Sequence, residues 1–127
     1  MTISRTPKKA DSVANQRLKT EVDKIIPDMV KVRHAIHQNP EIALKEFDTS
    51  ALIRKILKQA GIEVLRPFLE TDVVAIVKGK RTGKNVTLRA DIDALPLLEK
   101  TGLPYASQRK GTMHACGHDG HTAMVLG

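Results

Sequence analysis

The sequence contains no tryptophan, two phenylalanines and one tyrosine, so aromatic residues make up only 2% of the chain. A hydrophobic core must therefore be built from aliphatic side chains. No apolar run is longer than a few residues, which excludes a transmembrane helix because such a helix needs about 20 apolar residues in succession. The basic N-terminus, MTISRTPKKADS, is not followed by the apolar stretch of a secretory signal peptide.

Cysteine is equally scarce, since Cys116 is the only one. A single cysteine excludes an internal disulfide, and together with the lack of a signal peptide it predicts a cytoplasmic protein. The length of 127 residues suits one domain. An apolar content of 41% beside 28% charged residues is typical of a soluble globular protein.

Negative charge is in short supply, with 14 Asp and Glu against 21 Lys and Arg and a net charge of +7. Such an excess raises nucleic acid as a partner. The basic residues are spread over predicted helices and turns, however, and no aromatic residues are interleaved with them to stack on bases. A solvated basic surface is therefore favoured over nucleic-acid binding, and no membrane partner is expected.

One long segment, residues 11–37, has the apolar periodicity of an amphipathic helix. It follows residues 1–10, which are predicted to form a disordered leader. Pro27 predicts a kink or a restart of the helix at that point, and Asn39-Pro40 ends the segment. The apolar stripe consists of Leu18, Val22, Ile25, Met29, Val32 and Ile36.

A second helix is predicted over residues 48–60. Asp48 or Thr49 is expected to cap its N-terminus, and Gly61 occupies the position after its C-terminus where glycine is favoured. Its buried stripe is predicted to consist of Leu52, Ile53, Ile56, Leu57 and Ala60.

The apolar pattern then changes to that of short strands, which are predicted at residues 62–66, 73–78 and 86–90. A turn rich in Gly and Lys separates the last two strands. Residues 97–113 are irregular, and a further helix is expected to start at about Asp119. The sequence thus predicts a mixture of helices and short strands.

Three of the five histidines and the only cysteine lie between His114 and His121, in the stretch GTMHACGHDGHTAM. Thiolate and neutral imidazole are good ligands for zinc-like ions, and imidazole also suits Mn, Ni and Co. Gly117 allows Cys116 and His118 to turn toward one centre, and His118 and His121 would share a helix face. The spacing matches neither CxxC nor HExxH, so a thiol nucleophile, a buried structural Cys and chance clustering stay open.

A second polar stretch, LRADIDALPLLE, spans residues 88–99. Asp91 and Asp93 stand at the end of a predicted strand, the edge at which ligands bind in open α/β sheets, and both would point to the same side. A carboxylate there can ligate a metal, or accept the second imidazole N–H of a ligating His and fix its tautomer. The competing interpretation is a surface ion pair with Arg89.

Taken together, the segments RADIDALP, TGLPYAS and GTMHACGHDGHTAM resemble metal-dependent amidohydrolases of the aminoacylase and carboxypeptidase superfamily, in the branch of hippurate hydrolases and indole-3-acetyl-amino-acid hydrolases. The resemblance extends back through RHAIHQNPEIALKEFDTSALI and covers roughly residues 28–127. One departure is TDVVAIV at 71–77, where family members commonly have a glycine before the strand. The implied fold is the N-terminal part of a zinc-exopeptidase-like α/β/α catalytic domain, over residues 11–127, truncated before the rest of the sheet and the small dimerisation domain.

The resemblance also implies roles for individual residues. Cys116 and His118 would ligate metal, and Asp93 would stand behind the metal ions as a catalytic residue. A packing role is implied for His37. Four further residues of the motifs would line the site: Asp91, His114, Asp119 and His121.

The implied reaction is hydrolysis of an N-acyl amino acid, such as a hippurate-like amide, to a carboxylate and a free amino acid by a homo-oligomeric enzyme. Two divalent ions, Mn²⁺ or Zn²⁺ with Co²⁺ or Ni²⁺ as alternatives, would polarise the amide carbonyl and activate water, and a glutamate would move the proton. In the family this glutamate and the remaining ligands lie downstream of the CGH motif, and Glu99 is no substitute. We therefore expect an N-terminal fragment that is inactive or nearly so by itself.

Two other hypotheses stay open. The chain could be a small metal-binding or interaction module that needs a partner chain to complete the site, or it could be a basic nucleic-acid binder. A sheet without the helices that normally cover it would expose apolar edges and faces. A partly molten or aggregation-prone protein is therefore expected.

Overall fold

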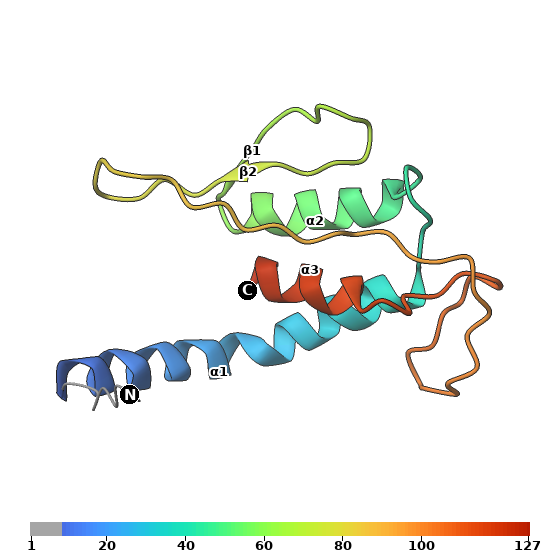
Figure 1. Cartoon of the computed structure of the whole chain (residues 1–127), viewed down its shortest axis with the longest axis horizontal. Coiled ribbons are helices and arrows are strands. Elements are labelled where there is room, and N and C mark those ends of the chain that lie inside the picture. Colours follow the sequence, from blue (N-terminus) through green and yellow to red (C-terminus); the bar gives the residue numbers. More distant parts are fainter. Residues whose placement is uncertain (1–8) are drawn as a thin grey trace, which may run out of the picture.

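A computed structural model describes residues 9–127 of the chain. Its elements are α1 (Lys9–Gln38), α2 (Phe47–Gln59), β1 (Glu63–Val64), β2 (Ala75–Ile76) and α3 (His118–Leu126). Figure 1 shows α3 alongside the C-terminal half of α1, whose N-terminal half projects beyond the other helices. The predicted leader lies outside the described residues, except that Lys9 and Ala10 already belong to α1. Within the described part of the chain, no helix combines the length and the apolar character needed to cross a membrane.

The long helix α1 follows the predicted periodicity and ends just before Asn39. It is continuous through Pro27, so of the two alternatives expected there, a kink or a restart, the restart is absent. Burial of its apolar stripe increases along the chain, from Leu18 at 64% exposed to Ile36 at 2%. Only the C-terminal half of α1 therefore contributes to the core.

Helix α2 begins one residue earlier than predicted, and its N-terminus is stabilised in a different way. Neither Asp48 nor Thr49 is the N-cap residue, because that position is Glu46, which makes no capping hydrogen bond through its side chain. The carboxylate of Glu41 instead accepts hydrogen bonds from the backbone N–H groups of Asp48 at 3.2 Å and Thr49 at 2.8 Å. A residue outside the helix thus satisfies its first free donors.

The C-terminal end of α2 agrees with the prediction. Gly61 has a φ of 72° and donates to the carbonyl of Lys58, while Ile62 donates to the carbonyl of Leu57. This pattern of paired bonds is a Schellman motif, which favours glycine because of the left-handed backbone. Of the stripe that was predicted to be buried, Ile53 is buried, whereas Ala60, which follows the last residue of the helix, is exposed. The other three residues, Leu52, Ile56 and Leu57, are only partly buried.

The β structure is smaller than predicted. Strands β1 and β2 contain two residues each and pair antiparallel, with Glu63 opposite Ile76. The third predicted strand, residues 86–90, is not a strand. Strand geometry requires a hydrogen-bonded neighbour, and among residues 9–127 none pairs with this segment; Val86 is 87% exposed and Leu88 is 73% exposed.

The segment that follows is fixed by backbone contacts from both sides. Ala94 forms a parallel bridge with Ile42, and its N–H donates to the carbonyl of Glu41 at 2.7 Å. Leu95 and Met113 exchange two backbone hydrogen bonds of 3.0 and 2.9 Å. The DIDALP segment is therefore held between the end of α1 and the stretch that leads into α3. The hydrophobic side chains buried in this part of the molecule are Ile36, Ile53, Ala94 and Ala123.

Candidate metal centre

The two polar motifs of the sequence come together at the first turn of α3. Gly117 precedes the helix with a φ of 80°, a left-handed conformation that suits glycine. Helix α3 then begins at His118, one residue before the expected start. Its Thr122 hydroxyl donates to the backbone carbonyl of Asp91 at 3.1 Å, which joins α3 to the RADIDALP segment.

His118 is oriented by Asp93. Its Nδ1 lies 2.9 Å from Oδ1 of Asp93 and 3.0 Å from the Asp93 backbone oxygen. Both partners are acceptors, so Nδ1 carries the proton and Nε2 presents its lone pair. A carboxylate on one ring nitrogen and a metal on the other is a common arrangement of ligating histidines. The geometry of His118 therefore fits a metal ligand.

Cys116 has an exposed, free thiol two residues before His118. Thiolate and imidazole are donor types that suit zinc and related ions. Within residues 9–127, however, no group of three or more His, Cys, Asp and Glu residues is placed to hold an ion. Cys116 and His118 fit a metal site by their chemistry, but they do not complete one alone.

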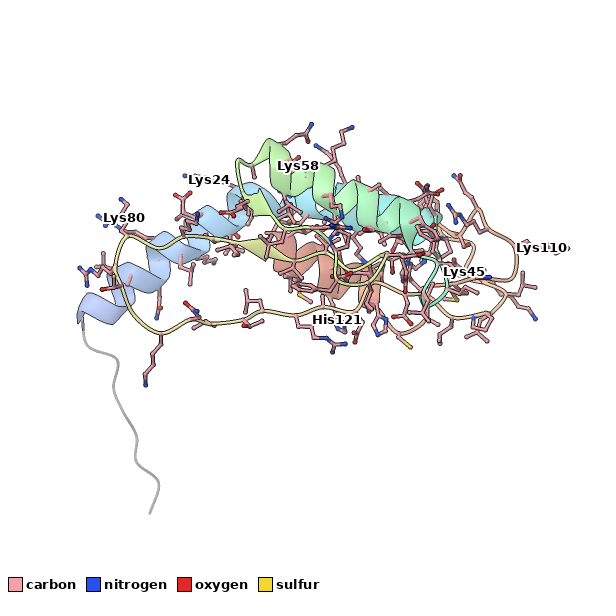
Figure 2. The ribbon with its side chains drawn as sticks, turned by 90° about the horizontal axis from the view of Figure 1, so that it is seen from above. Lys24, Lys45, Lys58, Lys80, Lys110 and His121 are labelled. Carbon is pink, nitrogen blue, oxygen red and sulfur yellow. The ribbon has the colours of Figure 1, made fainter. Side chains whose placement is uncertain are left out.

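Asp91 and His121 occupy the edge of this region. The Asp91 carboxylate forms an ion pair with Arg89, and both side chains are largely exposed, at 44% and 79%. The surface ion pair considered for the sequence is therefore present. His121 is exposed (Figure 2), and its ring centroid lies 6.0 Å from that of His118. The two histidines share a helix face, as their spacing predicts.

His114 is buried rather than placed on an open surface, with only 4% of the residue exposed. Neither of its ring nitrogens has a hydrogen-bond partner among the described residues. Burial lowers the pKa of His114, an effect that nearby Asp119 opposes. The ring lies with its centroid 6.2 Å from that of His37. Burial therefore disfavours the protonated form of His114, which lies beside the CGHDGH motif.

Asp119 is fully buried and faces α1. Its Oδ2 accepts hydrogen bonds from Nδ1 of His37 at 2.9 Å and from Nε of Arg33 at 3.0 Å. Burial works to raise the pKa of Asp119, but the bonds from His37 and Arg33 bring it below its ordinary value. The carboxylate is therefore ionised and paired, and it joins α3 to α1.

The other ring nitrogen of His37 faces Glu99. Their Nε2 and Oε1 atoms are 3.3 Å apart, and Glu99 also accepts from the backbone N–H of Ser107 at 2.7 Å and from the hydroxyl of Thr101. Burial tends to raise the pKa of Glu99, whereas the bonds from Thr101, Ser107 and His37 lower it below the usual value. Tyr105 packs edge-on against His37, with 5.4 Å between the two ring centroids. His37 thus links α1, α3 and the irregular segment.

Sequence reasoning gave His37 a packing role. It missed the contact of His37 with Glu99, and it missed Arg33, which bonds to the same Asp119 carboxylate as His37. The signal for Arg33 was available, because Arg33 and His37 are four residues apart and share one helix face. No comparable signal existed for Glu99. Its contacts depend on the path of an irregular segment, residues 97–113, which has no periodicity.

Comparison with known proteins gives matches over the part of the chain that contains this site. Residues 87–127, which contain both polar motifs, match a protein-family model. That family is Peptidase family M20/M25/M40. The crystal structure of a dinuclear metal-binding peptidase from the M20 family, from Bacillus subtilis, superimposes with a TM-score of 0.79 at 44% identity, over 82% of this chain and 29% of that one. The α/β fold of this chain is therefore that of part of an M20 catalytic domain.

Several curated proteins are similar to the chain over most of its length. It is 54% identical over 99 residues to an N-acetyl-L-cysteine deacetylase of Bacillus subtilis, which covers 78% of this chain and 24% of the relative. A hippurate hydrolase of Campylobacter jejuni is 49% identical over 76% of this chain and 25% of the relative. Thermostable carboxypeptidase 2 of Saccharolobus solfataricus is 46% identical over 88% of this chain and 29% of the relative.

The chain thus spans less than a third of the length of each of these relatives. The chain is therefore similar, over most of its own length, to proteins named as a deacetylase, a hippurate hydrolase and a carboxypeptidase, and to a dinuclear metal-binding peptidase of the M20 family. The expected resemblance is confirmed at this level.

Proposed function

We propose that residues 11–127 form the N-terminal part of the catalytic domain of a metal-dependent amidohydrolase, which hydrolyses N-acyl amino acids to a carboxylate and a free amino acid. The observation that carries the proposal is the 2.9 Å contact between His118 and Asp93, which leaves Nε2 of His118 available. The similarity to N-acyl amino acid deacetylases and a hippurate hydrolase supports the substrate class.

In this proposal Cys116 and His118 bind the metal, and Asp93 keeps the His118 ring in the tautomer that can bind. A divalent ion at such a site polarises the amide carbonyl and lowers the pKa of a bound water. Two ions per complete site are proposed, with Mn²⁺ or Zn²⁺ favoured and Co²⁺ or Ni²⁺ as alternatives. Asp91, His114 and His121 are proposed to shape the surroundings without binding the ion directly.

We further propose that this chain alone is inactive or nearly so. Glu99 is unsuited to act as the general base, because its carboxylate is already bonded to His37, Ser107 and Thr101. The two donors Cys116 and His118 are too few to hold a metal pair. The complete enzyme is proposed to be a cytoplasmic homo-oligomer.

The alternative function is a small metal-binding or interaction module whose site is completed by a partner chain. The observation that favours it is the same incomplete donor set within the described residues. It predicts metal binding that becomes tight only when the partner is present.

A hybrid enzyme tests the proposed function. The matching region of the Bacillus subtilis N-acetyl-L-cysteine deacetylase, 99 residues at 54% identity, is replaced by the corresponding residues of this chain. We expect hydrolysis of N-acetyl-L-cysteine with multiple turnovers, and loss of at least about 100-fold in rate on Cys116→Ser or His118→Gln.

Lys58→Gln is the matched control, because Lys58 lies on the exposed side of α2 (Figure 2). This variant should keep the activity of the unsubstituted hybrid. A folded hybrid that binds metal but does not hydrolyse the substrate would contradict the proposed function. So would full activity in the Cys116 and His118 variants.

A further inference from the structure

The first turn of α3 is held by polar contacts on two faces. On one face, His118 and Thr122 bond to Asp93 and to the backbone of Asp91. On the other face, Asp119 bonds to His37 and Arg33 of α1. Successive helical residues point about 100° apart, so a constraint on Asp119 fixes the direction of the adjacent His118.

The contact on the α1 side is the more buried of the two. The side chains of Asp119 and His37 are only 1% and 6% exposed, whereas those of His118 and Asp93 are 22% and 29% exposed. A buried carboxylate without its partners is strongly unfavourable. The position of Asp119 is therefore tightly defined, while the His118–Asp93 contact is more open to water.

We propose that Asp119 is a positioning residue, which through its bond to His37 sets the rotation of α3 so that His118 meets Asp93 with Nε2 free for a metal ion. The inference rests on the proposed function only for the identity of His118 as a ligand. The contact between Asp119 and His37 and the contact between His118 and Asp93 are both observed geometry.

His37 is suited to this function because it is held on both sides. Its Nδ1 faces Asp119 and its Nε2 faces Glu99, at 2.9 and 3.3 Å. Glu99 is in turn fixed by the N–H of Ser107. The ring therefore cannot turn away from Asp119 without losing a second buried contact, and this keeps α3 in one orientation.

Two substitutions of His37 separate its two contacts. In His37→Asn the side-chain amide nitrogen occupies about the place of Nδ1, so the bond to Asp119 is kept. In His37→Gln the amide reaches toward the place of Nε2, so the contact with Glu99 is kept and the bond to Asp119 is lost. Asp119→Asn changes the same contact from the side of Asp119, because it replaces the charged acceptor that faces Nδ1 of His37 with a neutral amide.

The measurement is the tautomer of the His118 ring in the full chain, from long-range proton–nitrogen NMR spectra, with the His118 signals identified by their absence in His118→Gln. The sample is kept well above the usual imidazole pKa of about 6.5, without metal. We expect Nδ1–H to dominate in the unsubstituted protein and in His37→Asn. In His37→Gln and Asp119→Asn we expect Nε2–H to become the major form.

An unchanged Nδ1–H tautomer of His118 in His37→Gln and Asp119→Asn would overturn the proposal. So would a loss of this tautomer that is equally large in His37→Asn and His37→Gln. A collapse of the amide spectrum in these variants would also count against it, because a positioning role requires the fold to survive. The readout uses neither metal nor substrate. A hybrid enzyme without activity would therefore not affect the conclusion from the tautomer. An unchanged tautomer, in turn, would not affect the conclusion from the activity of the hybrid.

Discussion

Nδ1 of His118 lies 2.9 Å from Oδ1 of Asp93, although the two residues are 25 positions apart in the sequence. The contact joins the RADIDALP motif to the CGHDGH motif and leaves the opposite ring nitrogen free. Of the two roles that the sequence allowed for a carboxylate at this place, the geometry corresponds to the one that fixes the tautomer of a histidine.

Removal of the Asp93 carboxylate should weaken metal binding. We expect Asp93→Asn to lower the affinity of the chain for Zn²⁺ by about 10- to 100-fold, because His118 loses the acceptor that orients it. Competition with a zinc-binding dye measures the change. Asp28→Asn is the control, since Asp28 lies on α1 with 70% of its side chain exposed. Equal affinities in both variants would show that Asp93 does not support a ligand.

Loss of the buried pair between α1 and α3 should destabilise the fold. Asp119→Ala leaves His37 and Arg33 facing an apolar side chain, and breaking a buried pair in this way costs about 3–5 kcal/mol. Urea unfolding followed by circular dichroism should show a transition at a much lower urea concentration. The same Asp28→Asn control should leave the transition nearly unchanged, and a similar small effect in Asp119→Ala would contradict the structural account.

Acid should weaken the fold through Asp119 and Glu99. The pKa of each carboxyl is lowered in the folded protein, so the unfolded chain binds more protons in the window below the ordinary carboxyl pKa of about 4. The stability that these groups contribute is therefore present above about pH 4 and is lost as the pH falls through their folded values. In Asp119→Asn the free energy of unfolding should therefore fall less steeply as the pH is lowered below about 4. A fall as steep as in the unsubstituted protein would contradict the assignment of this effect to Asp119.

His114 adds an effect in a higher pH window. Its pKa is lowered by burial, so the unfolded state binds the proton more readily below the usual imidazole pKa of about 6.5. Its contribution to stability is complete above that value and is lost as the pH falls toward the folded value. His114→Gln should remove this part of the pH dependence. If the free energy of unfolding depends on pH in the same way in His114→Gln and in the unsubstituted protein between about pH 5 and 7, the ring is not buried as described.

The segment around residues 86–88 should promote association of the isolated chain. Val86 is 87% exposed and Leu88 is 73% exposed, and exposed apolar segments of this kind favour aggregation. We expect the double change Val86→Thr and Leu88→Thr to reduce binding of a hydrophobic dye and to raise the solubility limit. The control is Lys84→Gln, at a neighbouring exposed position. An equal effect of the control would locate the association elsewhere.

The helices could be predicted closely because their signals are local. The ends of α1 and α2 depend on apolar periodicity, on Asn39-Pro40 and on Gly61, all of which can be found in the sequence. The cap of α2 was assigned wrongly because its acceptor, Glu41, lies outside the helix. Residues 86–90 have the composition of a strand, but a strand also needs a paired neighbour, which composition does not supply.

In the candidate site, too, some features could be predicted from the sequence and others could not. The roles predicted for Cys116, His118 and Asp93 come from residue type and from the resemblance of the motifs, because metal chemistry restricts which side chains can serve. The buried contacts of Asp119 with His37 and Arg33 were missed because they depend on how α3 packs against α1. Burial of His114 was missed for the same reason, since its neighbours come from distant parts of the chain.

The central claim is that Cys116 and His118 bind the same metal ion, and Co²⁺ absorption spectroscopy of the hybrid enzyme, in which the remaining part of the site is present, tests it most directly. A cobalt–thiolate bond gives a near-ultraviolet charge-transfer band, and the visible bands report the coordination geometry. We predict that Co²⁺ produces the charge-transfer band, that Cys116→Ser abolishes it, and that His118→Gln weakens it by at least about 10-fold in apparent affinity. Absence of the band in the unsubstituted hybrid, or a band that is unchanged in His118→Gln, would contradict the claim.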